Sequence, residues 1–444
     1  MREKRKIRIN GKVLLFLCIL FLTGILERAH IVYAAELPES AGAPEVYLSE
    51  TEVSMAPATT KTLKLIGAPA AVKWSSSNQK VAEVDASSGK VTAKAKGTTV
   101  ITATCKKKKY TCTVTVAYKK HTAADGMRYK DASGSFGRTG RWFKKSVGGG
   151  KYYFTNTDGS AIYFKVVGSK YVNINFVSKV SAGTPYYAYS VDGGKMNRQQ
   201  ITKKKISVGN TKTHYVRLII DATSEYENRW GAEAGVGIKS IQPVTQDGVV
   251  AAIKPQNAII AFYGDSISKG VRTLGMGTPS GTSTTHSFSW YCAEQLDLVP
   301  YFAGFGASGI VEKGTADRCY NVINNFSSFR KAESFQADVV VVEHGTNDIY
   351  THGSAYVNEY KKVLSQLHKK FPKAQIMAMI PLNQIHADDI RQAASSYKKW
   401  CTVVETNALG LSYTDGIHPN AASSKKIGKL LAKKVAAKRK ITLK

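Results

Sequence analysis

Residues 258–268, AIIAFYGDSIS, decide the fold of this chain. The apolar run 258–263 predicts a buried β-strand, and the glycine and polar residues after it predict a turn at the strand's carboxyl end. Ligands of open parallel sheets bind just outside the carboxyl ends of the strands, so Ser266 is expected to face a crevice. Gly-Asp-Ser is also ordinary turn chemistry. The rest of the chain must therefore supply the partners that a reactive serine needs.

Short apolar runs alternate with amphipathic segments through residues 250–444, and this order predicts an α/β domain. Near-continuous Val, Ile and Ala strands joined by helices indicate a parallel sheet covered on both faces. The expectation is a three-layer fold around a five-stranded sheet. Its predicted strands are 258–263, 299–305, 338–343, 375–380 and 401–405, and its predicted helices are 287–296, 317–329, 355–371, 387–399 and a terminal helix from 421.

Polar motifs follow four of the predicted strands, where a parallel sheet brings them to one edge. The motifs are GDS at 264–266, GASG at 306–309, HGTND at 344–348 and YTDGIHPN at 413–420. Their order and content resemble the SGNH/GDSL hydrolase superfamily. The resemblance extends from residue 258 to the C-terminus.

The resemblance implies a role for each motif residue. Ser266 matches the family's nucleophile, and Asp415 and His418 match its D-x-x-H pair. The implied oxyanion hole consists of the Ser266 N–H, the N–H of Gly309 in the family's S-G pair, and the side-chain amide of Asn347 in G-x-N-D.

Each of these parts is needed for the chemistry. A serine hydroxyl is a weak nucleophile at neutral pH, so His418 must take its proton as Ser266 attacks an acyl carbonyl. Asp415, three residues before the histidine, is near enough to hold the other ring nitrogen. Each oxyanion donor lowers the barrier by about 3–4 kcal/mol. Hydrolysis by this route needs no metal and no organic cofactor.

Other polar residues near the motifs have simpler interpretations. Asp265 and Asp348 are expected to brace their loops through hydrogen bonds, and His344 to be a packed or solvated histidine. Gly306 is the alternative to Gly309 as the oxyanion-hole glycine, if the GASG motif is aligned differently with the family's S-G pair. Asp415 is also a candidate helix cap, because it precedes the predicted terminal helix and some members of the superfamily work with a Ser-His dyad.

Two β-rich regions precede the α/β domain. Residues 46–117 contain short alternating segments separated by turns, as in a small antiparallel sandwich. They resemble the bacterial Ig-like group 2 domain through WSSSN at 74–78, VAEVD at 81–85, SGKV at 88–91 and GTTVIT at 97–102.

Residues 118–247 predict an independent β-sandwich or jelly roll, because alternation is clear and no useful helical period appears. Ile162, Phe164 and Val166, for example, share one face of a predicted strand. Aromatic residues in sandwiches mostly fill the core. A sugar-stacking platform is the alternative for the aromatic residues of this region, Trp142, Tyr152, Tyr153, Tyr186, Tyr187, Tyr189 and Trp230.

A β-sandwich directly before an SGNH domain resembles carbohydrate esterase family 2, whose members remove acetyl groups from polysaccharides. The likeness rests on domain order and on turns such as GRW at 140–142 and VDG at 191–193. It implies an O-acetylated glycan as substrate and partner. Tyr350, Trp290 and Tyr413 are candidate residues for lining the substrate site.

The N-terminus predicts export. Residues 1–12 are rich in Arg and Lys, residues 13–26 are apolar, and VYA at 32–34 suits a cleavage site. The apolar stretch is shorter than the roughly 20 residues that span a bilayer. A cleaved signal peptide over 1–34 is expected, leaving no stable membrane span, with an uncleaved anchor as the alternative. The protein is expected to be secreted or associated with the cell surface.

The net charge is +31, from 63 Lys and Arg against 32 Asp and Glu. The positive charge is spread along the chain and accompanies no nucleic-acid-reading motif, so a nucleic-acid partner is not expected. Such diffuse charge fits anionic cell-wall polymers as partners or simply solubility, and solubility is the favoured interpretation.

Five cysteines remain beyond residue 34, and their spacings do not resemble a zinc site. Cys105 and Cys112 flank a lysine run and are candidates for a disulfide across a hairpin.

Three other functions use the same features. A lipase or lysophospholipase of the superfamily would prefer long-chain esters to acetyl esters. A surface adhesin would bind through the Ig-like module and carry a degenerate hydrolase domain, against which the intact motifs argue. An acyltransferase would pass the acyl group to a sugar hydroxyl instead of water.

Overall fold

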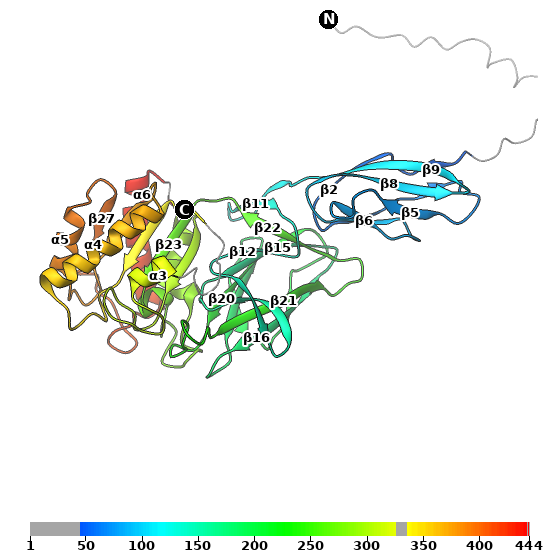
Figure 1. Cartoon of the computed structure of the whole chain (residues 1–444). Helices are drawn as coiled ribbons and strands as arrows, with labels where there is room; N and C mark the ends of the chain where they lie inside the picture. The colour runs from blue at the N-terminus through cyan, green and yellow to red at the C-terminus, as the bar shows by residue number, and fades with distance from the viewer. Residues whose placement is uncertain (1–44, 326–334, 442, 444) are drawn as a thin grey trace, which may run out of the picture. The chain divides into compact units, whose positions relative to one another are not determined.

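The computed structural model describes residues 45–325, 335–441 and 443 of the chain. The signal peptide expected over residues 1–34 lies outside the described residues. Within them, an Ig-like β region is followed by a second β-rich region and then by an α/β region (Figure 1). In the described part of the chain, no helix is both long enough and apolar enough to cross a membrane.

The first region is the Ig-like sandwich that the sequence predicts. Every second residue of β8 (Gly97–Cys105) from Thr99 onward is buried, which is the period of a strand with one face on a core. Trp74 on β5 (Lys73–Ser76) packs in that core. The other strands are β1 (Tyr47–Leu48), β2 (Glu52–Met55), β3 (Thr60–Thr62), β4 (Leu65–Ile66), β6 (Ala82–Val84), β7 (Lys90–Ala93) and β9 (Lys108–Val116). They form the sheets β2-β9-β8-β5 and β3-β7-β6 and the pair β1-β4.

The candidate disulfide between Cys105 and Cys112 is not formed, because both residues are free cysteines with buried side chains. They lie on neighbouring strands, but the register places Cys105 opposite Lys108 and Cys112 opposite Ile101. This offset of four residues corresponds to about 13 Å along a strand. A disulfide joins Cα atoms less than about 7 Å apart.

The second region is a β-sandwich of two antiparallel sheets. Its strands are β10 (Lys120–Thr122), β11 (Arg128–Asp131), β12 (Gly137–Thr139), β13 (Phe143–Val147), β14 (Gly150–Thr155), β15 (Ala161–Val167), β16 (Tyr171–Lys179), β17 (Tyr186–Val191), β18 (Asn197–Gln200), β19 (Lys205–Ser207), β20 (His214–Ala222), β21 (Gly235–Pro243) and β22 (Val249–Pro255). One sheet has the order β10-β11-β22-β15-β20-β17-β18 with β12 beside β15, and the other has the order β13-β14-β21-β16-β19. Ile162, Phe164 and Val166 lie in the core between them, on one face of β15 as predicted.

The boundary after this sandwich lies later than residues 247–250, where the sequence pattern placed it. Strand β22 pairs with β11 and β15, so Val249–Pro255 belongs to the sandwich. An apolar run that completes an antiparallel sheet has the same local pattern as one that starts a parallel sheet.

The third region is the predicted α/β domain. Its five-stranded parallel sheet has the order β24-β23-β25-β26-β27. These strands are β23 (Ile259–Gly264), β24 (Val299–Gly304), β25 (Val339–Glu343), β26 (Gln375–Met379) and β27 (Cys401–Val404). The helices are α1 (Ser266–Lys269), the short 3₁₀ helix η1 (Thr284–His286), α2 (Phe288–Gln295), α3 (Cys319–Asn325), α4 (Gly353–Lys370), α5 (Ala387–Ser395) and α6 (Ala421–Arg439).

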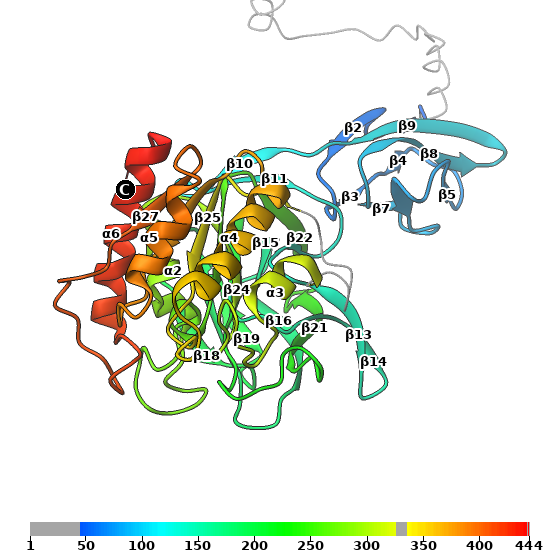
Figure 2. The same ribbon diagram turned by 60° about the vertical axis from the view of Figure 1, so that its left-hand side comes forward.

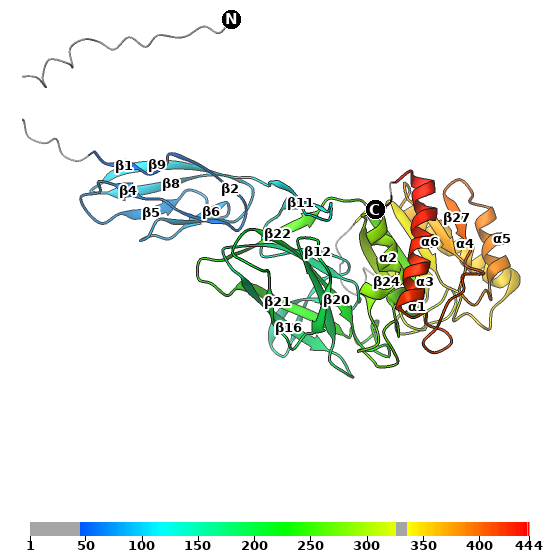
Figure 3. The same cartoon turned by 180° about the vertical axis from the view of Figure 1, so that it is seen from behind.

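Helices cover both faces of this sheet. Val340 and Val342 pack in one core with Tyr360 of α4 and with residues of α3 and α5, which face the viewer in Figure 2. Val339 and Val341 pack in the other core with residues of α2 and α6, which face the viewer in Figure 3. Each strand is therefore buried on both sides, as expected for near-continuous apolar strands.

The β-sandwich packs directly on the α/β region. Tyr129 and Tyr163 share a hydrophobic cluster with Phe262 and Phe302 of the parallel sheet. Gly159 lies at this contact with φ +86°, and a Cβ there would come within 2.1 Å of the Phe302 ring. Only glycine suits that close approach.

Trp290 lies in this interface and does not line the substrate site, contrary to the prediction. Only 3% of its surface is exposed. The guanidinium of Arg217 lies 4.8 Å from the centre of the indole ring. Arg217 in turn donates to both carboxylate oxygens of Glu294, at 2.8 and 3.1 Å. Trp290 lies on the buried face of α2. The spacing of apolar residues in the sequence did not show which face of this helix would be buried.

A buried ion cluster also joins the two regions. Asp158 of the sandwich lies 3.1 Å from the Nζ of Lys269 on α1 and 3.5 Å from Nη1 of Arg229. All three side chains are almost fully buried. Burial opposes the ionisation of Asp158, but Lys269 and Arg229 still lower its pKa. Burial lowers the pKa of Lys269 to about 8 although Asp158 opposes that shift. The helix that starts with Ser266 is thus held by a charge from another domain.

Replacing Asp158 with Asn should destabilise the protein strongly. The change preserves volume but leaves Lys269 and Arg229 as buried cations without their carboxylate, at a cost of about 3–5 kcal/mol. Urea unfolding followed by tryptophan fluorescence measures the loss. Glu405→Gln is the control, because it removes a carboxylate from an exposed pair with Arg391 and should cost only a small fraction of that. Equal effects of the two changes would contradict the role of the buried cluster.

Candidate active site

Ser266 is placed by the end of β23. It is the first residue of α1, and the carboxylate of Asp265 caps that helix by accepting the Ile267 N–H at 2.8 Å. A Cβ on Gly264 would lie 2.2 Å from Ser268 Oγ and 2.8 Å from the Glu343 carbonyl oxygen. The glycine therefore allows the turn to pack tightly between two strand ends. Asp265 acts as a structural residue of the turn, as the sequence indicated.

His418 and Asp415 lie beside this serine. His418 Nε2 is 2.8 Å from Ser266 Oγ, and His418 Nδ1 is 2.8 Å from Asp415 Oδ2. The other oxygen of Asp415 accepts the N–H groups of Ile417 and His418 at 3.1 and 2.8 Å. Burial opposes ionisation of Asp415, but these N–H groups and the His418 ring lower its pKa. Asp415 does not cap α6, whose N-cap is Asn420.

Arg272 is a part of the site that the motifs did not reveal. Its Nη1 donates to Asp415 Oδ2 at 2.6 Å, and its Nη2 donates to Glu225 of the β-sandwich at 2.8 Å. Its backbone is left-handed, with φ +56°, which is uncommon for a residue with a side chain. The Thr414 hydroxyl donates to its carbonyl oxygen at 2.7 Å. No local signal identifies Arg272, because its two acidic partners are distant in sequence.

Of the three expected oxyanion donors, Ser266 and Asn347 lie at one hollow, and the Gly309 N–H points elsewhere. As the first residue of a helix, Ser266 has an N–H without an intrahelical acceptor. The Asn347 amide donates to the Ser308 carbonyl oxygen at 3.0 Å and lies 3.3 Å from Asp265 Oδ2. Ser266 and Asn347 both line a hollow of about 230 Å³. His418, Gly306 and Ala307 line it as well. We call this the catalytic hollow.

The structure does not direct the Gly309 N–H into the catalytic hollow. That N–H donates to the Glu312 carbonyl oxygen at 3.0 Å, and a Cβ on Gly309 would lie 2.2 Å from the Asp348 carboxylate. Asp348 accepts the N–H groups of the next three residues at 2.8–2.9 Å, so it braces this loop as expected. Gly306, the alternative considered from the sequence, lines the hollow. In the described part of the chain, the N–H groups of Gly306 and Ala307 have no protein acceptor.

A buried carboxyl pair lies beside the turn that carries Ser266. Glu343 ends β25 and is almost fully buried beside Asp265. Burial raises the pKa of both carboxyl groups, and the charge of Asp265 raises that of Glu343 further. The pair therefore retains a proton at pH values where exposed carboxyl groups have lost theirs. His344, next to Glu343, is a packed histidine whose pKa burial lowers to about 4.

This pair predicts a pH dependence of stability. Its carboxyl groups bind more protons in the folded than in the unfolded chain above about pH 4, so stability should fall as pH rises from about 5 to 8. Glu343→Gln removes one titrating group and should flatten this fall by up to about 1.4 kcal/mol per pH unit. Urea unfolding of both proteins at several pH values measures the difference. An unchanged pH profile in the variant would contradict the proton-retaining pair.

The remaining predicted lining residues lie at the surface near the motif loops. Tyr413 is 36% exposed and lines a mostly apolar hollow of about 350 Å³ with Ile267, Ile349 and Ile417. Ile417 also lines the catalytic hollow, so the two hollows adjoin. Tyr350 is 83% exposed.

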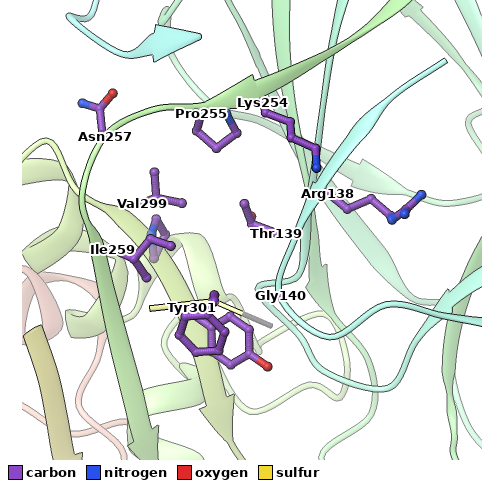
Figure 4. Close-up of a pocket in the computed structure, with 11 residues that line it drawn as sticks. Arg138, Thr139, Gly140, Lys254, Pro255, Asn257, Ile259, Val299 and Tyr301 are labelled. Carbon is purple, nitrogen blue, oxygen red and sulfur yellow. The ribbon is translucent and has the colours of Figure 1, made fainter. Parts of the chain in front are cut away.

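Two other features of the described residues lie apart from these motifs. Figure 4 shows a cavity of about 160 Å³ lined by Arg138 and Lys254 and by Ile259 and Val299, which begin β23 and β24. It is at the amino ends of the strands, opposite to the motif loops. The ligand atoms of His352, His386 and Asp389 lie within 4.8 Å of one another. Both nitrogens of the His386 ring are already hydrogen-bonded, to Asp389 Oδ2 and to the Asp348 carbonyl oxygen.

A three-layer α/β fold with these four motifs at one sheet edge defines the class of SGNH-type carboxylic ester hydrolases. Comparison with family models agrees with this class of enzyme. Residues 262–426 match the GDSL-like Lipase/Acylhydrolase family, and residues 43–116 match the Bacterial Ig-like domain (group 2). The C-terminal region of the chain is thus similar to GDSL-like lipases and acylhydrolases, and it follows a region similar to bacterial Ig-like domains.

Solved structures share the fold of the sandwich and the α/β region. A carbohydrate esterase family 2 enzyme from Corynascus thermopiles (Myceliophthora fergusii) is 20% identical, with a TM-score of 0.55 over 68% of this chain and 99% of that chain. A family two carbohydrate esterase from Clostridium thermocellum, solved with cellohexaose, is 18% identical, with a TM-score of 0.55 over 69% and 99%. An acetyl xylan esterase from the rumen bacterium Butyrivibrio proteoclasticus is 16% identical, with a TM-score of 0.54 over 71% and 99%. A search of curated protein sequences finds no match.

Proposed function

We propose that this protein is a secreted or cell-surface serine esterase that removes O-acyl groups, acetyl groups above all, from a polysaccharide or cell-wall glycan. The observation that carries the proposal is the chain of contacts Ser266–His418–Asp415, with two consecutive distances of 2.8 Å, open to the catalytic hollow. This is the arrangement of a serine nucleophile, its base and the group that orients the base.

The geometry supports the following mechanism. His418 Nε2 accepts the Ser266 proton as Oγ attacks the ester carbonyl, and Asp415 stabilises the imidazolium that forms. The donors proposed for the oxyanion are the Ser266 N–H, the Asn347 amide and the N–H groups of Gly306 and Ala307, because all four residues line the catalytic hollow. His418 then donates its proton to the leaving sugar oxygen. Water, activated by the same histidine, hydrolyses the acyl-enzyme and restores the serine.

The glycan substrate is supported by the fold that this chain shares with carbohydrate esterases and an acetyl xylan esterase. Export is supported by the basic and apolar segments of residues 1–34. The net charge of +31 suits a protein that works beside anionic wall polymers.

A lipase-type esterase is the second candidate, and one observation favours it. The hollow beside the catalytic hollow is lined mainly by Ile267, Ile349, Leu382, Tyr413 and Ile417, and it would suit a longer acyl chain. Rates on 4-nitrophenyl esters from acetate to dodecanoate separate the candidates. A maximum at acetate supports the deacetylase, and a maximum at eight carbons or more supports the lipase.

Ser266→Ala should abolish hydrolysis of 4-nitrophenyl acetate and of acetylated xylan, because no nucleophile remains. Chromogenic and acetate-release assays measure the two activities. Ser280→Ala changes an exposed serine on the loop after α1 and should behave as wild type. Wild-type rates in Ser266→Ala would overturn the proposed function.

Asp415→Asn should lower kcat by about 10³-fold or more, because the amide cannot stabilise the His418 imidazolium and favours the wrong tautomer. The exposed carboxylate Asp388 provides the control Asp388→Asn, which should leave kcat near the wild-type value. A loss of less than about tenfold in Asp415→Asn would indicate that Ser266 and His418 work as a dyad.

A further inference from the structure

An exposed tyrosine of the β-sandwich stands at the edge of the catalytic hollow. Tyr226 is 71% exposed, yet its hydroxyl is held by Arg272 Nη2 at 3.1 Å. Arg272 is itself fixed between Asp415 and Glu225. A large aromatic ring thus stands at the surface, tethered through its hydroxyl group, although it gains little stabilisation from burial there. Such a ring suits a partner that stacks on its face.

Tyr226 belongs to the lining of two hollows. One is the catalytic hollow, and the other is a hollow of about 460 Å³, which we call the outer hollow. Tyr226, Ala307 and Thr315 line both. A chain molecule whose ester occupies the catalytic hollow can therefore continue over Tyr226 into the outer hollow.

The lining of the outer hollow combines an aromatic ring with polar groups. Trp230 lines it together with Asn228, Lys313 and Asp317. Asn228 Oδ1 accepts the N–H groups of Gly231 and Ala232, which leaves its Nδ2 as a donor. Lys313 is well exposed and lies 4.0 Å from Asp317. A pyranose ring offers an apolar face for the aromatic rings and hydroxyl groups for the amide, amine and carboxylate.

The loop that carries these residues is anchored. The Arg229 N–H donates to the Thr315 carbonyl oxygen at 2.8 Å, and its guanidinium donates to the Ser224 carbonyl oxygen at 2.9 Å. The same guanidinium belongs to the buried cluster with Asp158. The β-sandwich therefore presents Tyr226 and Trp230 on a fixed loop, and a preorganised site loses less entropy when it binds.

We infer that residues 224–231 of the β-sandwich form a sugar-binding subsite next to the catalytic hollow, which takes the residue adjoining the acylated sugar of a glycan chain. The inference rests on the proposed function, because the ester must lie at Ser266 for the chain to continue into the outer hollow. It assigns to the sandwich a direct part in choosing oligosaccharides over small esters.

The test compares kcat/KM for acetylated xylotetraose with kcat/KM for 4-nitrophenyl acetate in the full-length protein. Tyr226→Ala and Trp230→Ala should each lower the ratio of the two values about tenfold, mainly through KM for the tetrasaccharide. Tyr226→Phe preserves the ring but loses the hydroxyl that Arg272 holds, so the ratio should fall clearly less than in Tyr226→Ala. Tyr47→Ala removes an exposed tyrosine of the Ig-like domain and should leave the ratio unchanged.

A second measurement does not depend on turnover. Titration calorimetry of Ser266→Ala with unacetylated xylotetraose should detect binding that Trp230→Ala in the same background weakens about tenfold. Unchanged ratios in Tyr226→Ala and Trp230→Ala would overturn the subsite, and so would an effect confined to Tyr226→Ala. Wild-type protein that hydrolyses neither ester would instead refute the proposed function.

Discussion

The buried contact of Asp158 with Lys269 and Arg229 is the constraint on which the rest of the site depends. Lys269 belongs to the helix that begins with Ser266, and Arg229 belongs to the sandwich loop beside the catalytic hollow. Buried charges are costly unless they are paired with good geometry, so separating the two domains at this cluster would leave buried charges without partners. The contact that holds the helix of Ser266 therefore also holds the sandwich loop that carries Arg229.

Arg272 extends the same coupling to the other end of the site. It holds Asp415, the partner of His418, and at the same time Glu225 and Tyr226 of the sandwich. The acid of the proposed triad and the proposed sugar platform thus share one guanidinium. Because arginine forms several hydrogen bonds in a rigid plane, Arg272 ties the position of Asp415 to that of the sandwich loop.

Much of the fold was predictable because its signals are local. The alternating strands of the first two regions and the apolar strands of the third are periodic. Within the described residues, the predicted elements of the α/β region match the structure within a few residues, and the end of the helix predicted over 317–329 lies outside the described residues. The errors came where a local pattern fits two environments. The pattern of Val249–Pro255 is that of an apolar strand in either sheet. Trp290 would fit either a pocket or an interface. A hairpin brings Cys105 close to Cys112 only in one register of its two strands.

By itself, the sequence determined the class of fold and the residues that meet at one sheet edge, because strand order and turn motifs place Ser266, Asn347, Asp415 and His418 there. Tertiary structure alone decided that Gly309 bonds within its own loop while Gly306 and Ala307 line the catalytic hollow. It alone brought Glu343 beneath Asp265, and Arg272 between two domains. These contacts join residues far apart in the chain, and their geometry is set by packing, which no local period records.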